Sequence, residues 1–164
     1  MKRSFLFNLP YYLIKPPGLL WSRGWYGIAD ETGDGSIFYR AQRTERRVRS
    51  LTNLVGKSGV IWLRLGSSAW HKEHASDIII FAEQVINHLG GETVLVTTDG
   101  DMSVPSDLPN DVTNKILGDK NIVAWFTKNY DGSVSDPKLR PIPVGLDLHT
   151  GPNGKSISPI KKAE

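Results

Sequence analysis

Two carboxylates separated by one glycine are the most distinctive candidates for chemistry in this sequence. Asp99 and Asp101 flank Gly100 directly after an apolar run. At this spacing two carboxylates can point the same way across a tight turn, as a metal-bridged diphosphate site requires. The pattern is also a common turn, in which Asp101 accepts backbone hydrogen bonds from the following loop. We predict no metal site, and we take Asp101 as the candidate catalytic residue.

Polar residues also follow the neighbouring candidate strands. Gly66 and Ser67 come after the first strand, and Asn129 and Tyr130 come after the third. In an open parallel sheet, ligands bind beyond the carboxyl ends of the strands. These four residues, together with Asp99, are therefore the candidate substrate-binding residues. The competing interpretation is that loops are polar in most proteins.

Three further motifs resemble ligand sites but are incomplete. Residues 55–58 (VGKS) and 153–156 (NGKS) end like phosphate-binding loops, but each lacks the required earlier glycine. His71 and His74 could share a helix face and bind a metal, but their segment offers no third ligand. The chain has no cysteine, which excludes thiolate catalysis and disulfides. We expect no cofactor.

Three apolar runs of strand length precede the polar loops, at residues 60–65, 93–98 and 122–127. Each is rich in Val, Ile, Leu, Thr or Trp, which is typical of parallel strands buried on both faces. Between them, residues 76–89 and 108–117 carry apolar side chains at helical spacing. This alternation predicts an α/β fold, a Rossmann-like parallel sheet flanked by helices.

Residues 36–56 predict one more amphipathic helix, capped by Ser36 and ended by Gly56. Arginines lie away from its apolar stripe, at Arg40, Arg43, Arg46, Arg47 and Arg49. They indicate either a solvated helix face or a surface that docks on an acidic partner or a membrane. The helix belongs to the basic part of the chain, because residues 1–57 hold ten Lys or Arg against four acids.

The composition is that of a soluble globular domain, with 164 residues, 39% hydrophobic and 23% charged. The net charge of +3 is too small to predict nucleic-acid binding. No apolar stretch reaches the roughly 20 residues of a membrane-spanning helix, so we expect no transmembrane segment. The N-terminus resembles a signal peptide only faintly, because Asn8 and Pro10 interrupt its apolar region and no small-residue cleavage site follows. We therefore expect a cytoplasmic protein.

The chain divides into three expected parts. Residues 1–35 form an irregular N-terminal arm, residues 36–150 the Rossmann-like α/β domain, and residues 151–164 a disordered tail. Within the domain, the extended run at 139–144 should lie at a sheet edge or leave the sheet. Its two prolines, Pro141 and Pro143, have no N–H to donate to a neighbouring strand.

Three segments of the second half also carry a family resemblance. They are residues 94–101 (VLVTTDGD), 122–130 (IVAWFTKNY) and 138–146 (KLRPIPVGL). In order and spacing they resemble exostosin-related glycosyltransferases. The resemblance implies a GT-B arrangement, in which the amino-terminal Rossmann-like half shapes the acceptor side and a second domain grips the nucleotide sugar. Asp101 matches the acidic loop position of that family, and Asn129 matches its strand-end asparagine.

The function implied by the resemblance is a glycosyltransferase-like domain. It would bind a sugar or glycan acceptor at the strand carboxyl ends, with Asp101 deprotonating the acceptor hydroxyl and Asn129 orienting it. We expect it to be incomplete without a donor-binding domain. The alternative is a non-catalytic α/β module that binds an anionic ligand or a protein partner through the arginine-bearing helix.

Overall fold

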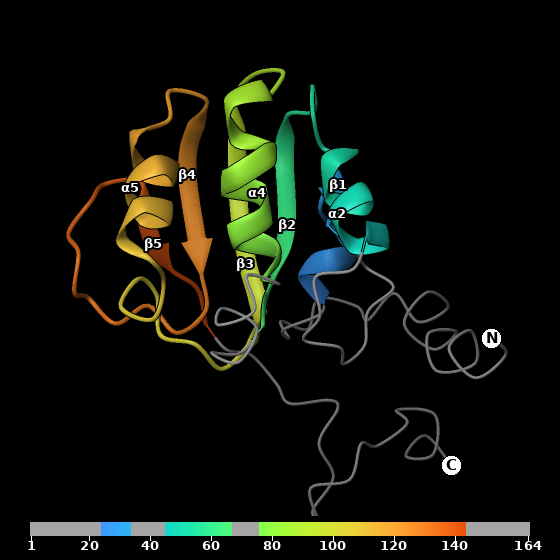
Figure 1. Ribbon diagram of the computed structural model, residues 1–164. Coiled ribbons are helices and arrows are strands. Elements are labelled where there is room, and N and C mark those ends of the chain that lie inside the picture. Colours follow the sequence, from blue (N-terminus) through green and yellow to red (C-terminus); the bar gives the residue numbers. More distant parts are fainter. Residues whose placement is uncertain (1–23, 34–44, 67–75, 144–164) are drawn as a thin grey trace, which may run out of the picture.

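The computed structural model describes residues 24–33, 45–66 and 76–143, which form a parallel sheet with helices packed against it (Figure 1). The strands are β1 (Glu31–Thr32), β2 (Gly59–Gly66), β3 (Thr93–Gly100), β4 (Ile122–Thr127) and β5 (Leu139–Pro141). The helices are α2 (Glu45–Thr52), α4 (Asp77–Gln84) and α5 (Asn110–Gly118), and the 3-10 turns are η1 (Gly24–Gly27) and η2 (Ile86–His88). This architecture confirms the predicted α/β class.

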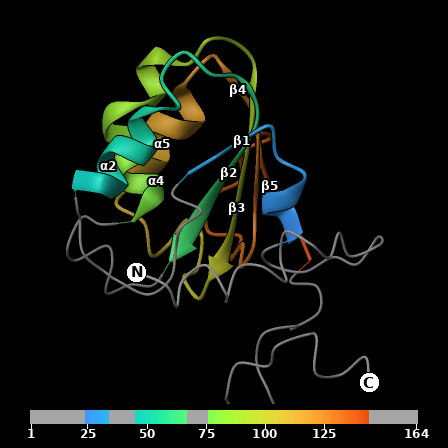
Figure 2. The same cartoon turned by 90° about the vertical axis from the view of Figure 1, so that its right-hand side faces the viewer.

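The five strands lie side by side in chain order, β1-β2-β3-β4-β5, and every neighbouring pair is parallel. When successive right-handed crossovers all move along the sheet in the same direction, their helices lie on the same face of the sheet. Accordingly, α2, α4 and α5 all lie on one side of the sheet, while η1 lies on the other (Figure 2). The strand order of the described sheet never reverses, unlike that of a doubly wound sheet.

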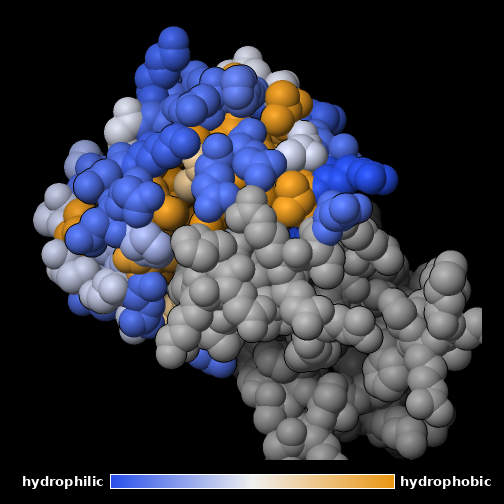
Figure 3. Space-filling view, in the orientation of Figure 1, coloured by the Kyte–Doolittle hydropathy of each residue, from blue (hydrophilic) through white to orange (hydrophobic). Residues whose placement is uncertain are grey.

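The hydrophobic core lies between the sheet and the three helices. Every second residue of β2, namely Ile61, Leu63 and Leu65, belongs to this core and is fully buried. From the helix side, Phe81 of α4 is equally buried. We call this side of the sheet the helix face. The outer surface of the helix layer is mostly hydrophilic, with small hydrophobic areas between (Figure 3).

Most predicted elements are present, with shifted ends. The strand predicted at 122–127 has the bounds of β4, whereas β2 and β3 extend beyond the predicted runs. The helix predicted at 76–89 is α4 followed by η2. Ser76 is the N-cap residue of α4, although its hydroxyl makes no cap hydrogen bond and instead donates to Leu65 O at 3.5 Å.

Two other predicted helices are shorter in the described part of the chain. The helix expected at 108–117 begins at Asn110. Of the helix expected at 36–56, α2 covers 45–52, and residues 34–44 lie outside the described residues. None of the described helices is long and apolar enough to cross a membrane.

Both edges of the sheet are formed by very short strands. At one edge β5 pairs with β4, as the two prolines of its run predict. At the other edge β1 pairs with β2, and Gly33 N donates to Trp62 O at 3.0 Å. The sheet therefore begins before residue 36, inside the segment expected to be an arm. A two-residue strand is too short for any periodic pattern to reveal. Residues 1–23 and the predicted tail are not among the described residues.

Candidate functional site

The carboxyl ends of β2, β3 and β4 meet at one edge of the sheet, and all three turn through left-handed backbone there. The φ angles are 78° at Gly66, 58° at Asp99 and 60° at Asn129. Residues other than glycine adopt this region rarely, and such conformations concentrate at ligand and active sites. We call Gly66, Asp99, Gly100, Asp101 and Asn129 the carboxyl edge, and we take it as the candidate site.

Two glycines bring β2 and β3 into close contact at this edge. Gly66 pairs with Gly100, and Asp101 N donates to Gly66 O at 3.0 Å. A Cβ atom on Gly100 would lie 2.1 Å from Gly66 O, a separation that real Cβ atoms do not reach. Backbone packing therefore explains the glycine at position 100, and the left-handed φ explains the one at 66. A binding role for Gly66 stays a prediction.

The two carboxylates of the Asp-Gly-Asp sequence have different surroundings. Asp99 Oδ2 accepts hydrogen bonds from Arg64 Nε at 2.8 Å and Nη2 at 2.6 Å, and both side chains are about nine-tenths buried. Asp101 is exposed, and no described residue donates a hydrogen bond to its carboxylate. The described residues also contain no group of three or more side chains that could hold a metal ion. Asp101 is thus the carboxylate that is open to a ligand.

Asn129 and Tyr130 hold the loop after β4 in place. Asn129 Nδ2 donates to Gly100 O at 3.1 Å, which ties the end of β4 to the end of β3. The Tyr130 hydroxyl donates to Val134 O at 2.8 Å within its own loop. Both side chains are half-buried. They shape the carboxyl edge, and their contact with a substrate stays a prediction, as does that of Ser67, which lies outside the described ranges.

An exposed carboxylate joins the loop after β4 to the loop after β3. Asp131 accepts hydrogen bonds from Ser106 N at 3.0 Å and Ser133 N at 2.8 Å. Slight burial acts to raise the pKa of Asp131, but the hydroxyl and N–H groups of Ser133 and Ser106 outweigh it and lower the pKa to about 2. The folded loops therefore prefer the ionised form.

Asp131→Asn should make the free energy of unfolding less dependent on pH in the acidic range. Because its folded pKa is depressed, Asp131 stabilises the fold above its ordinary pKa of 3.8, and this stabilisation is lost as pH falls toward about 2. Urea denaturation of both proteins between neutral pH and about pH 2 measures this, and the difference in their stability should shrink across that window. A difference that does not change with pH would contradict the role given to Asp131.

A buried ion pair that the sequence analysis missed joins α2 to α4. Asp77 is fully buried, and its Oδ1 accepts hydrogen bonds from Arg47 Nε at 2.8 Å and from Nη2. Its Oδ2 accepts one from Arg64 N at 3.2 Å. Burial raises the pKa of Asp77, and Arg47 and Arg64 oppose that rise. For Arg47, the interpretation as part of a solvated or docking face is wrong, because only 7% of it is exposed.

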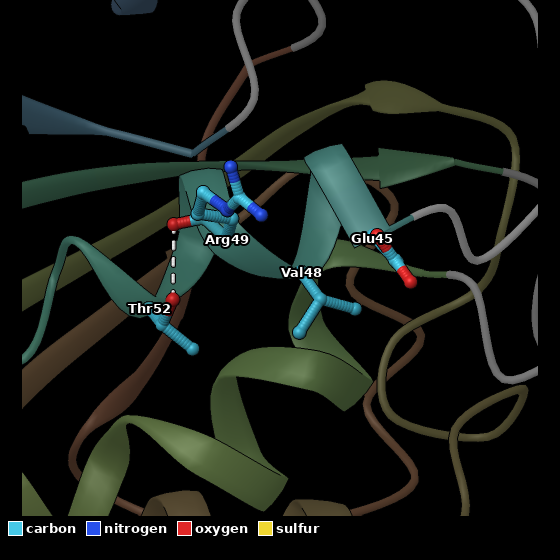
Figure 4. A pocket seen from close by; sticks show the side chains of 4 residues that line it. All are labelled: Glu45, Val48, Arg49 and Thr52. Atoms are coloured by element: carbon cyan, nitrogen blue, oxygen red, sulfur yellow. Dashed lines mark hydrogen bonds between the residues drawn. The ribbon is translucent and has the colours of Figure 1, made fainter.

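Four residues of α2 line a pocket (Figure 4). Its described lining is Glu45, Val48, Arg49 and Thr52, and the Thr52 hydroxyl donates to Arg49 O at 2.9 Å. Arg49 is exposed here, with the acid Glu45 one helical turn away. A surface that carries charges of both signs attracts an anion only weakly. Docking through the predicted arginine face therefore rests on Arg49 within the described residues.

Of the remaining sequence motifs, the structure describes the one at residues 55–58. Residues 53–56 form a turn with Gly56 at φ 77°, so the first phosphate-loop-like sequence is a turn. The second such sequence and both histidines, His71 and His74, lie beyond the described ranges. A signal for the missed ion pairs was Arg64, a charge inside an otherwise apolar strand.

No family model, no curated protein and no solved structure matches this chain. The resemblance to exostosin-related glycosyltransferases therefore stays a prediction. Several of the residues that carry it have a folding role. Lys138 Nζ donates to Leu117 O at 2.9 Å and Asp119 O at 2.8 Å, which satisfies the end of α5. Trp125 and Leu139 are core residues.

Proposed function

We propose that this chain is a glycosyltransferase-like domain that binds a sugar or glycan acceptor at the carboxyl edge. The observation that carries the proposal is an exposed carboxylate, Asp101, whose preceding peptide group is held by hydrogen bonds on both its N–H and its C=O. Its N–H is bonded to Gly66 O, and the preceding carbonyl, Gly100 O, accepts from Asn129. Fixed backbone around an accessible acid–base group is what a catalytic site requires.

The chemistry proposed for Asp101 is general-base catalysis. A carboxylate within hydrogen-bond reach of an acceptor hydroxyl takes its proton as the oxygen attacks the anomeric carbon of the donor. The bond from that carbon to the leaving nucleotide breaks in the same reaction. A donor-binding domain, elsewhere in a longer chain or in a partner, would hold the nucleotide sugar. Asn129 supports the loop, and its amide nitrogen is already bonded within the protein.

The Arg64–Asp99 pair is proposed to stabilise the backbone of this site. Its two side chains are bonded to each other and nearly buried, so they hold the end of β3 in its left-handed turn. Two charged hydrogen bonds from one guanidinium to Asp99 Oδ2 hold the two groups together more firmly than one would. Asp99 is then a positioning residue in this proposal, and Asp101 is the residue that meets the acceptor.

Asp101→Asn tests the proposal by direct binding. The chain is screened on a glycan array, and the affinity of each oligosaccharide bound by the wild type is then measured for the variant. We expect affinity to fall at least about tenfold, which corresponds to the loss of one hydrogen bond to a charged group. The melting temperature should stay close to that of the wild type, because Asp101 is exposed.

Glu92→Gln is the matched control, since Glu92 is also exposed but precedes β3 at the opposite end of the same strand. It should bind the array oligosaccharides as the wild type does. Equal losses in the two variants, or no glycan bound by the wild type, would refute acceptor binding at the carboxyl edge. A large fall in melting temperature for Asp101→Asn alone would make Asp101 a structural carboxylate instead.

A further inference from the structure

Three buried side chains near the carboxyl ends of β3 and β4 are joined by hydrogen bonds. The Trp125 indole N–H donates to Thr97 Oγ1 at 3.0 Å. The Thr97 hydroxyl donates to Thr127 Oγ1 at 2.8 Å. The Thr127 hydroxyl in turn donates to the backbone oxygen Lys128 O at 2.9 Å. All three side chains are fully buried. We call Trp125, Thr97 and Thr127 the threonine chain.

The threonine chain lies on the helix face, where packing alone would favour apolar residues. Thr97 follows the core residue Leu95 by two positions, and residues two apart in a strand point to the same side. Thr127 follows the core residue Trp125 in the same way, and it pairs with Thr97 across the two strands. A buried hydroxyl costs free energy unless it is hydrogen-bonded. Each of these hydroxyls accepts one hydrogen bond and donates one, so both are satisfied.

The last bond of the threonine chain fixes the peptide group that leads into Asn129. Asn129 has a φ of 60°, and a residue other than glycine keeps this conformation only where its surroundings hold it. The bond from Thr127 to Lys128 O holds the carbonyl that precedes Asn129. The carbonyl that follows accepts from Val104 N at 2.9 Å, and the side chain donates to Gly100 O. Asn129 is therefore held at three points.

Asn129 connects the threonine chain to the candidate site. Gly100 O, which accepts from Asn129 Nδ2, belongs to the same peptide group as Asp101 N. Asp101 N donates to Gly66 O at 3.0 Å. Hydrogen bonds therefore run from the hydrophobic core to the backbone beside the exposed carboxylate. Buried hydrogen bonds in series strengthen one another, and a binding site depends on such supporting residues.

We propose that Thr97 and Thr127 are positioning residues of the carboxyl edge, which act through Lys128 O and Asn129 on the backbone of Asp101. Without the Thr127 hydroxyl, one of the three bonds that hold Asn129 is lost. The bond from Asn129 to Gly100 O then opens more often, and with it the bond made by Asp101 N. The consequence for acceptor binding rests on the proposed function, whereas the consequence for the backbone does not.

Thr127→Val tests the proposal, because valine has nearly the shape of threonine but lacks the hydroxyl. Amide hydrogen exchange is measured by NMR in the full-length chain. The N–H groups of Asp101 and Val104 should exchange at least about fivefold faster than in the wild type, as expected where a buried acceptor loses its donor. The N–H groups of Gly59 and Gly90, which are bonded at the opposite end of the sheet, should change much less.

Two further variants separate positioning from a general loss of stability. Thr127→Ser keeps the hydroxyl, so Asp101 and Val104 should exchange as in the wild type. Thr93→Val is the matched control, because Thr93 is equally buried and its hydroxyl donates to Gly91 O at 3.0 Å, at the opposite end of β3. It should leave Asp101 and Val104 unchanged. Exchange at Asp101 and Val104 that is no faster in Thr127→Val than in Thr127→Ser or Thr93→Val would overturn the proposal.

A measurement on the wild type keeps the test decisive if Thr127→Val does not fold. The hydroxyl protons of Thr97 and Thr127 should be protected from solvent and give their own NMR signals. Rapid exchange of both protons with water would show that the threonine chain is not formed.

Glycan binding is measured separately on Thr127→Val and Thr127→Ser. Affinity should fall in the first variant and be kept in the second, and equal affinity of Thr127→Val and the wild type would refute positioning for binding. If the wild type binds no glycan while the exchange results are as expected, the proposed function fails and the positioning of the backbone stands.

Discussion

Asp77→Ala should lower the free energy of unfolding by about 3–5 kcal/mol, the cost of leaving one member of a buried ion pair without its partner. Asp77 is fully buried, and Arg47, which is 7% exposed, would lose its carboxylate. The N–H of Arg64 would lose its acceptor as well. The same carboxylate contacts α2 and β2 from α4, so its loss loosens three elements together. Urea denaturation at neutral pH measures the change.

Asp111→Ala is the matched control for this prediction. Both aspartates lie in the first turn of a helix, where a negative charge is favourable, but Asp111 is exposed. Asp111→Ala should cost no more than about 1 kcal/mol, and the excess cost of Asp77→Ala then measures the buried pair.

A double variant, Arg47→Met with Asp77→Leu, distinguishes the contribution of the ion pair from the cost of removing only one of its two charges. Replacing both charges by apolar groups of similar size is often neutral or stabilising, because neither charge is then left buried alone. We expect its stability to lie much closer to the wild type than that of Asp77→Ala. If Asp77→Ala costs no more than the Asp111 control, the buried ion pair contributes nothing to stability.

Gly100→Ala should lower the free energy of unfolding by about 3 kcal/mol, the upper end of what overpacking usually costs. The new Cβ would lie 2.1 Å from Gly66 O and 2.5 Å from Gly66 N. Both atoms are backbone, so relief requires β2 and β3 to separate at the carboxyl edge. The movement would also break the hydrogen bond from Asp101 N to Gly66 O. Under the proposed function, the variant should lose glycan binding as well.

Gly118→Ala is the control, because a Cβ there has nothing within 4 Å. Alanine at a compatible position restricts the unfolded chain and stabilises by about 0.4–1 kcal/mol. Gly118→Ala should therefore raise the melting temperature and the free energy of unfolding in urea, whereas Gly100→Ala should lower both. Equal stability of Gly100→Ala and the wild type would show that the two strands separate at this edge without cost.

The strands and the fold class could be predicted because their signals are local. Continuous apolar runs mark buried parallel strands wherever they occur, and the run at 122–127 has the bounds of β4. The edge position of β5 also follows from local chemistry, since proline has no N–H for a neighbouring strand. The helix ends were less predictable, and α4 stops at Gln84, five residues before the apolar pattern ends.

The proximity of the candidate residues could be predicted from the sequence, but their surroundings could not. The polar residues after β3 and β4 do lie together at the carboxyl edge, because parallel strands end at the same side of a sheet. The difference between the surroundings of Asp99 and those of Asp101 was not predictable. It depends on Arg64, which is 35 residues from Asp99 in sequence. The sequence resemblance named Asp101 and Asn129, and the structure adds that Asn129 is bonded to Gly100 O.

The sequence by itself determined which segments become strands and helices and that these build a parallel α/β sheet, since hydrophobic pattern and proline act over a few residues. Tertiary structure alone decided which charges are buried. Helical spacing places Arg47 on the same side as the buried Leu51 and Leu54, but its partner Asp77 is 30 residues away, so the pairing itself is not visible in the sequence. The monotonic strand order was likewise decided in three dimensions. Contacts between distant residues set these features, because a buried charge or an apolar face is stable only when its partner is brought to it.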